Sequence, residues 1–234
     1  MASIVIWTPE SVYDSQAVVC IAQKILKYYG FNIEIVEATK QAWNQAIKEP
    51  DGLKRAVDIY LKQHELVIFL IDADGVQSQT QRRQEPNSLI NRIKRVVAQS
   101  KDRALLILMR EELEAWLLAD CLGICCYFTQ SEETRNNPDW IKFAQKNQRG
   151  DTHLITEAEP GGKNSKEYLI NFSKKILKKI NPKLKEQDLK KRQYHESLSG
   201  EVAKYMEINQ QVVNRNSSLR EFVQHFSKQA HINE

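Results

Sequence analysis

Six consecutive apolar residues, 66–71, end directly in the sequence Asp72-Ala73-Asp74-Gly75. An uninterrupted apolar run of this length is typical of a parallel strand that is covered on both faces of its sheet. Asp72 and Asp74 are two residues apart, so an extended backbone directs both carboxylates to the same side. Because open α/β sheets bind ligands just beyond the carboxyl ends of their strands, this strand tip is a candidate functional site.

The acidic pair has two interpretations. Two carboxylates on one side repel each other unless a cation lies between them, and proteins commonly bind Mg²⁺ through one or two carboxylates, water and substrate phosphates. The pair therefore fits a metal site that faces a phosphate-bearing substrate. Alternatively, Asp72 caps the following loop and Asp74 begins an Asp-Gly turn, an arrangement that requires no metal.

Strand and helix patterns alternate along the first half of the chain. We expect strands at 3–7, 31–36, 66–71 and 104–109, and helices at 13–29, 53–63, 86–99 and 111–122. This order predicts an α/β fold in which right-handed crossovers build a parallel sheet flanked by helices. Phe31, Ile33 and Ile35 alternate with polar residues, so the second strand is expected at an edge of the sheet.

Beyond Pro138 no strand pattern remains, and helices are expected at 166–180, 201–208 and 218–227. We therefore predict an α/β domain over 1–130 and a helical C-terminal region over 131–234. Nine Lys and Arg residues lie between Lys174 and Arg192, against two acidic residues. Such a run can neutralise the phosphates of a nucleic acid, or it is simply a solvated helical face. No aromatic residue interleaves it, so base stacking is not indicated there.

Composition excludes several classes of protein. The chain has 234 residues with 41% hydrophobic and 27% charged residues, as in ordinary globular proteins. No apolar run approaches the roughly 18–20 residues of a membrane span, so no membrane partner is expected. The four cysteines, two of them adjacent, do not resemble a disulfide framework, and the N-terminus lacks the pattern of a secretory signal. A reducing, cytoplasmic location is therefore expected.

Acidic residues follow three of the four predicted strands. They are Glu10 after the first strand, Asp72 and Asp74 after the third, and Glu111, Glu112 and Glu114 after the fourth. Because the carboxyl ends of parallel strands point the same way, these residues should converge on one edge of the sheet. Glu111 and Glu114 share a helix face. Acids in a first helical turn also complement the helix dipole, which accounts for Glu111 and Glu112 without a function.

This arrangement resembles the TOPRIM fold, which is shared by topoisomerases, primases and nucleases of the overcoming-lysogenization-defect type. The segment 114–120, Glu-Ala-Trp-Leu-Leu-Ala-Asp, looks like the segment that follows the fourth strand in an uncharacterised TOPRIM-like family of small proteins. Members of that family are often encoded beside an ATPase in phage-defence or mobile loci. The tail from Tyr194 to Phe226 also resembles the helical end of that family. The resemblance covers most of the chain.

The resemblance implies a metal-dependent nuclease that hydrolyses nucleic-acid phosphodiester bonds, uses Mg²⁺ or Mn²⁺ and acts in antiviral defence. It implies catalytic carboxylates at Glu10, Asp72, Asp74 and Glu114, and metal ligands at Asp72, Asp74, Glu10 and Glu111. Asp14 matches the acid that follows the family glutamate by four residues. Arginine suits phosphate geometry, so the loop residues Arg82, Arg83 and Lys163 are candidate phosphate ligands.

Two departures from the family pattern favour a second hypothesis. The family has Glu-Gly directly at the end of the first strand, whereas this chain has Pro9-Glu10-Ser11 two residues further on. His195 stands where the family tends to have lysine after its late tyrosine. The alternative to a nuclease is a non-catalytic module of the same fold. It would bind a partner ATPase through its helical tail or a nucleic acid through residues 174–192.

Overall fold

The computed structural model of the chain describes residues 2–8, 12–39, 44, 46, 49, 51–72, 85–86, 88–109, 112–147 and 165–232. At its centre is a four-stranded sheet with the order β2-β1-β3-β4. The strands are β1 (Ala2–Trp7), β2 (Ile33–Glu37), β3 (Leu66–Asp72) and β4 (Ala104–Met109). All three strand pairs are parallel, so the predicted α/β fold with a parallel sheet is confirmed.

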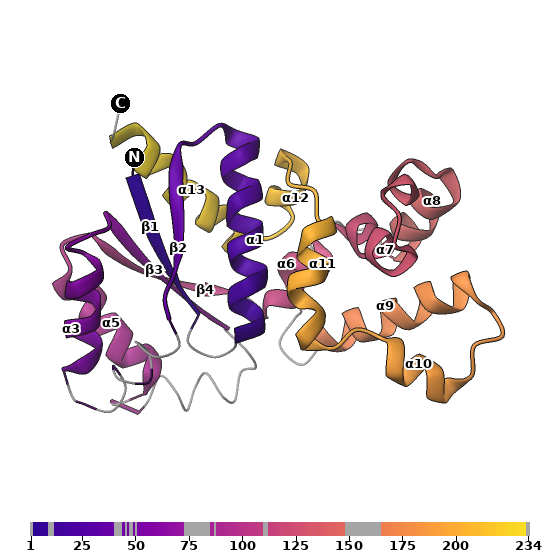
Figure 1. Cartoon of the computed structure of the whole chain (residues 1–234), viewed down its shortest axis with the longest axis horizontal. Coiled ribbons are helices and arrows are strands. Elements are labelled where there is room, and N and C mark those ends of the chain that lie inside the picture. The colour runs from indigo at the N-terminus through magenta and orange to yellow at the C-terminus, as the bar shows by residue number, and fades with distance from the viewer. Residues whose placement is uncertain are drawn as a thin grey trace.

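Helices flank this sheet and form the C-terminal region (Figure 1). They are α1 (Val12–Tyr29), α3 (Gly52–Tyr60), α5 (Leu89–Gln99), α6 (Leu113–Leu118), α7 (Cys121–Thr129), α8 (Pro138–Asn147), α9 (Ser165–Ile180), α10 (Glu186–Arg192), α11 (Ser199–Tyr205), α12 (Gln210–Asn214) and α13 (Ser217–Ile232), with short 3-10 helices η1 (Glu132–Asn136) and η2 (Glu196–Leu198). In Figure 1, α3 and α5 lie at one end of the molecule and α7 to α10 at the other.

The side chains of the strands alternate between two hydrophobic cores, as the pleat of a sheet requires. Val67, Phe69 and Ile71 of β3 pack in the core beneath α3 and α5. Leu66, Ile68 and Leu70 pack in the other core, together with buried residues of α1, α6 and α13. The continuous apolar run of β3 is therefore explained by burial on both faces. The face that carries Leu66, Ile68 and Leu70 is called the α1 face below.

The edge position predicted for the second strand is confirmed, but the strand begins later than expected. β2 pairs only with β1, and Glu34 is exposed while Ile33 is buried. Gly30 has φ +72°, and the Phe31 backbone N–H donates to the Leu26 carbonyl over 3.0 Å. Glycine adopts this left-handed conformation without strain, so Gly30 ends α1. Residues 30–32 therefore form the end of the helix and the connection, and the strand begins after them.

Several predicted helices have other bounds in the structure: the helices expected at 53–63 and 201–208 end at Tyr60 and Tyr205, and the one expected at 218–227 continues to Ile232. The helix expected at 86–99 begins at Leu89, because the Ser88 hydroxyl accepts the backbone N–H of Asn91 and caps it. The helix expected at 111–122 is divided into α6 and α7, with Asp120 in a non-helical conformation between them. Helices α8, α10 and α12 were not expected from the sequence pattern.

The helical C-terminal region packs directly on the sheet domain. Helix α11 lies against α1, and α13 lies against β4. The Trp116 indole N–H of α6 donates to the Ser218 hydroxyl of α13 over 2.9 Å, and its ring lies 5.2 Å from that of Phe222. Trp116 is thus a packing residue at the centre of this contact. Among the described residues, no helix combines the length and the apolar character needed to cross a membrane.

Candidate functional site

Asp72 lies at the carboxyl end of the sheet, where the sequence predicts it. It is the last residue of β3 and is paired in register with Met109, the last residue of β4. Side chains alternate along a strand, so Asp72 follows Leu70 on the α1 face. Its side chain is partly exposed, whereas the six residues before it in β3 are buried. The chain therefore changes from core to surface at this residue.

Glu114 lies in the first turn of α6, which follows β4, and is only 5% exposed. The hydroxyl of Tyr194 donates to Glu114 Oε1 over 2.9 Å and lies 2.7 Å from the Ser199 hydroxyl. The Tyr194 backbone N–H donates to the Ser173 hydroxyl over 2.8 Å. All four residues are buried, and they connect α6 to α9 and α11. Hydrogen bonds of this kind offset much of the free-energy cost of burying a carboxyl group.

The surroundings of Tyr194 keep its hydroxyl protonated. Burial raises the Tyr194 pKa far above its ordinary value, and the negative charge of Glu114 raises it further. Asp14, in the first turn of α1, also contributes to the raised pKa of Tyr194. Tyr194 is therefore a hydrogen-bond donor at any physiological pH.

Three carboxylates thus lie after three different strands of the sheet. Asp14 is in the helix that follows β1, Asp72 ends β3, and Glu114 is in the helix that follows β4. The buried residues of α1 and α6 pack in the core of the α1 face, on which Asp72 also lies. We call these three residues the acidic edge. Each of them follows a strand at the carboxyl end of the sheet. The convergence expected for Glu10, Asp72, Asp74 and the glutamates after β4 involves residues outside the described ranges and stays a prediction.

The backbone of Glu112 is strained where the chain enters α6. Its φ of 112° and ψ of 163° lie in a region that is essentially confined to glycine. Its carboxylate Oε2 accepts the backbone N–H of Lys166, at the start of α9, over 3.2 Å. A non-glycine residue persists in such a conformation only when its surroundings hold it there, and functional sites are where this is most often seen.

Six of the eight residues that the sequence nominates as catalytic, metal-binding or phosphate-binding lie outside the described ranges. They are Glu10, Asp74, Glu111, Arg82, Arg83 and Lys163. Among the residues that the structure describes, no group of three or more His, Cys, Asp or Glu side chains is arranged to hold a metal ion. The metal ligands named from the resemblance therefore stay a prediction. Of these ligands, the structure describes Asp72.

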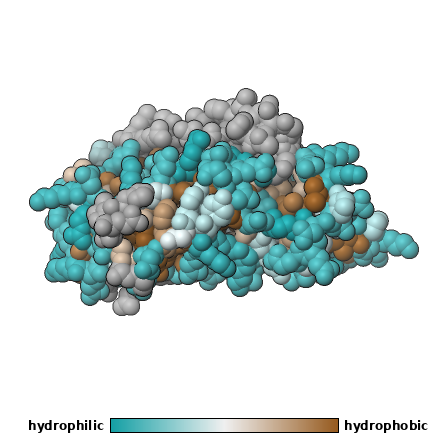
Figure 2. All heavy atoms as spheres, turned by 90° about the horizontal axis from the view of Figure 1, so that it is seen from above, coloured by the Kyte–Doolittle hydropathy of each residue, from teal (hydrophilic) through white to brown (hydrophobic). Residues whose placement is uncertain are grey.

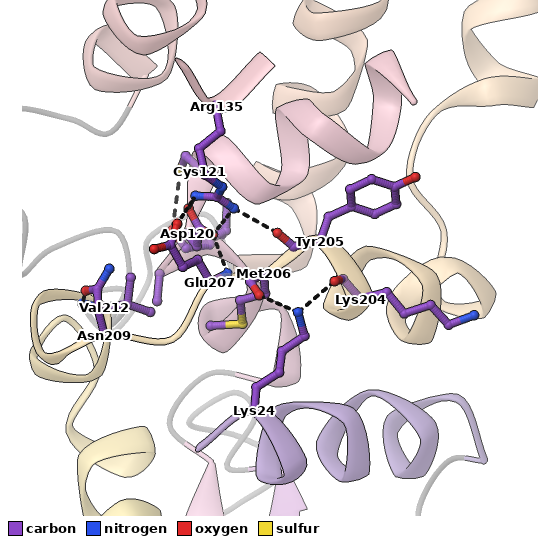
Figure 3. A network of polar contacts seen from close by, with 12 residues as sticks. Lys24, Asp120, Cys121, Arg135, Lys204, Tyr205, Met206, Glu207, Asn209 and Val212 are labelled. Atoms are coloured by element: carbon purple, nitrogen blue, oxygen red, sulfur yellow. Dashed lines mark hydrogen bonds and ion pairs between the residues drawn. The ribbon is translucent and has the colours of Figure 1, made fainter. Parts of the chain in front are cut away.

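A second polar network joins α7 to the connection between α11 and α12 (Figure 3). Asp120 accepts two hydrogen bonds from the Arg135 guanidinium, at 2.7 and 3.2 Å, and one from the Glu207 backbone N–H at 2.8 Å. Arg135 also donates to the Tyr205 carbonyl over 2.8 Å. The Lys24 ammonium of α1 donates to the carbonyls of residues 204 and 206, each over 2.7 Å.

This network closes one side of a surface pocket of about 480 Å³ that is bordered by α1 and residues 204–208. Three of the cations that line the pocket already have partners. Lys24 and Arg135 bind backbone carbonyls, and Lys204 pairs with Glu201. The network therefore fixes the helical region to α1 rather than presenting free charges to a ligand. Asp120, the last residue of the segment 114–120, belongs to this structural network.

Comparisons with protein-family models, with curated proteins and with solved structures found no match for the chain.

Proposed function

We propose that this protein is a metal-dependent nuclease of TOPRIM-like fold that hydrolyses nucleic-acid phosphodiester bonds in defence against phage or mobile DNA. The observation that carries the proposal is the position of Asp72. It ends a fully buried parallel strand on the α1 face, where the helices that bear Asp14 and Glu114 also pack. Carboxyl ends of parallel strands are where such folds place their reacting groups.

The chemistry of the nominated side chains fits Mg²⁺ or Mn²⁺, because Asp72, Asp74, Glu10 and Glu111 offer only hard oxygen ligands. When bound, the ion would stabilise charge on the phosphate and lower the pKa of a bound water. Asp72 and Asp74 would hold the ion, and Glu10 and Glu111 would complete its ligands. Arg82, Arg83 and Lys163 would neutralise the phosphate that is cleaved.

Tyr194 and Glu114 have a positioning part in this proposal. The protonated Tyr194 hydroxyl fixes the Glu114 carboxylate at the start of α6, three residues after Glu111. This buried hydrogen bond is one of those that attach the start of α6 to the helical region. A catalytic part for Glu114 itself stays a prediction.

The first test is calorimetric titration of Mn²⁺ into the wild-type protein and into Asp72→Asn/Asp74→Asn, with and without an oligonucleotide. We expect saturable binding by the wild type and its loss in the variant. The matched control is Asp51→Asn/Asp102→Asn, which removes the same two charges from exposed positions before α3 and after α5. Absence of saturable binding by the wild type under both conditions would overturn the metal site.

The second test is cleavage of DNA and RNA oligonucleotides with Mg²⁺, with Mn²⁺ and with EDTA. Cleavage that requires the metal and is lost in Asp72→Asn/Asp74→Asn would support the nuclease. The assay is repeated with the ATPase encoded nearby, if the locus has one, because the family resemblance pairs the two. Nucleic-acid binding without cleavage in either assay would favour the non-catalytic module of the same fold.

A further inference from the structure

The positive charge of the chain is concentrated on helices that project away from the sheet. Segment 165–192 contains ten basic and three acidic residues, a net charge of +7, whereas the whole chain has +4. The remainder of the chain is therefore net acidic. Figure 1 shows α9 and α10 at the end of the molecule opposite α3 and α5. We call α9, α10 and the connection between them the basic arm.

Packing of α9 sorts its residues into two faces. Leu169, Phe172 and Ile176 are buried. Lys178 is exposed on the opposite side of the helix, and Lys175 and Lys179 are exposed beside the buried face. The connection to α10 adds exposed lysines at 183 and 185, and the last turn of α10 adds three further exposed cations. The helix dipole favours cations in the last turns of α9 and α10, but it does not account for the connection.

Among the residues that the structure describes, the nine basic residues between 174 and 192 take part in no ion pair. Nearby cations repel one another unless an anion neutralises them, and a surface that is only solvated usually intersperses both signs. The face of the molecule seen in Figure 2 is mostly hydrophilic, with small hydrophobic patches.

The structure adds an aromatic residue that the basic sequence run lacks. Trp140 of α8 is partly exposed, and the Lys179 ammonium lies 4.9 Å from its ring centroid. Phe143 lies edge-on to Trp140 at 5.5 Å and is stacked on Phe172 at 5.9 Å. The Trp140 ring is therefore supported from the core of the arm, and a cation-π contact holds a lysine over it.

We propose that the basic arm and Trp140 form a binding surface for single-stranded nucleic acid. Backbone phosphates would neutralise the exposed lysines, and one base would stack on Trp140, with Lys179 moving from the ring to a phosphate. Aromatic rings beside a cationic track are how proteins bind single strands, because every base offers a π face. In a duplex the bases are stacked on one another and are not offered to Trp140. The inference rests on the proposed function in one respect: it takes the bound single-stranded nucleic acid to be the substrate of the nuclease.

The charge part is tested by fluorescence anisotropy in EDTA, with a labelled oligothymidylate of about 16 nucleotides. We expect Lys178→Gln/Lys183→Gln to weaken binding by about tenfold or more at moderate salt. The slope of log affinity against log salt should become shallower by about 1.4, since each phosphate contact on a single strand contributes about 0.7. The matched control is Lys62→Gln/Lys94→Gln, which removes two exposed charges from the opposite end of the molecule. Equal effects in both variants, or none, would overturn the inference.

The stacking part is tested with Trp140→Phe and Trp140→Ala. Oligothymidylate should quench tryptophan fluorescence in the wild type, and Trp140→Phe should lose that signal while keeping most of the affinity. Trp140→Ala should bind about fivefold or more weakly, because stacking on an aromatic side chain is lost. Circular dichroism and thermal unfolding check that each variant is folded. A duplex of equal length that binds as tightly, with no effect of Trp140→Ala, would contradict the single-strand assignment.

The two proposals fail separately. Binding by the arm without metal-dependent cleavage would reject the nuclease and keep the inference. Metal-dependent cleavage, with normal oligothymidylate binding by the arm variants, would support the nuclease and reject the binding surface on the arm.

Discussion

The buried hydrogen bond from Tyr194 to Glu114 joins two residues that are 80 positions apart in the chain. The Glu114 carboxylate is 5% exposed, so it depends on protein donors rather than on water. Tyr194→Phe removes one such donor and leaves the rest of the ring in place. We expect this variant to lower the free energy of unfolding by about 2 kcal/mol, measured by urea denaturation.

A double-mutant cycle separates this hydrogen bond from packing. Glu114→Leu removes the acceptor, and the combination with Tyr194→Phe removes both polar partners. Because an unsatisfied buried group costs more than a missing pair, the double variant should be destabilised by less than the sum of the single changes. Additive effects would show that Tyr194 and Glu114 act independently.

At the scale of single residues, the sequence predicts positions better than contacts. Asp72 could be placed at a strand tip because the apolar run ends there, and the alternation of a strand then fixes its face. The partner of Glu114 could not be found in this way, since no periodicity links α6 to Tyr194. The strained backbone of Glu112 could not be predicted either, because no neighbouring residue in the sequence indicates a positive φ.

Among the elements, α6 and α7 show where pattern reading fails. Residues 111–122 keep a helical spacing of apolar residues, so the sequence predicts one helix there. The break at Asp120 arises because its carboxylate binds Arg135 and the backbone of Glu207, which come from other parts of the chain. The four strands were predicted within two residues at each end, because burial on both faces leaves a strong local signal.

At Gly123 of α7, helix propensity and packing predict opposite changes in the free energy of unfolding on substitution by alanine. A Cβ at this position would lie 2.8 Å from Asp120 Oδ2 and from the Tyr205 carbonyl oxygen, and 3.0 Å from the Met206 Cα. Helix propensity alone favours Gly123→Ala by about 1 kcal/mol. We expect the reverse, a loss of about 2 kcal/mol in urea denaturation, because backbone atoms of the facing segment must shift.

The matched control for this change is Gly200→Ala in α11. There a new Cβ would lie 3.2 Å from the Gln16 Cβ and 3.3 Å from its Oε1, so the neighbouring atoms must shift by only a few tenths of an ångström. We expect a smaller loss than at Gly123, or a gain. Stabilisation by Gly123→Ala would mean that the segment 205–206 packs less closely on α7 than the structure has it.

For the whole molecule, the question is whether the sheet domain and the helical region fold together. A boundary near residue 130, expected from the loss of strand patterns, stays a prediction. One continuous hydrophobic core, however, contains buried residues of β1 and β3 together with Phe172, Phe222 and Phe226 from the helical region. A fragment of residues 1–130 would expose the apolar surface that α13 and α11 cover.

We therefore expect the full chain to unfold in a single transition. Urea denaturation followed by tryptophan fluorescence and by far-ultraviolet circular dichroism should give coincident curves, because both signals report one cooperative unit. The buried Trp7 and Trp116 report the two cores on opposite faces of the sheet. The fragment 1–130, by the same argument, should lack a cooperative transition of its own. Two separated transitions in the full chain, with the first retained in the fragment, would make the helical region an independent domain and the acidic edge complete without it.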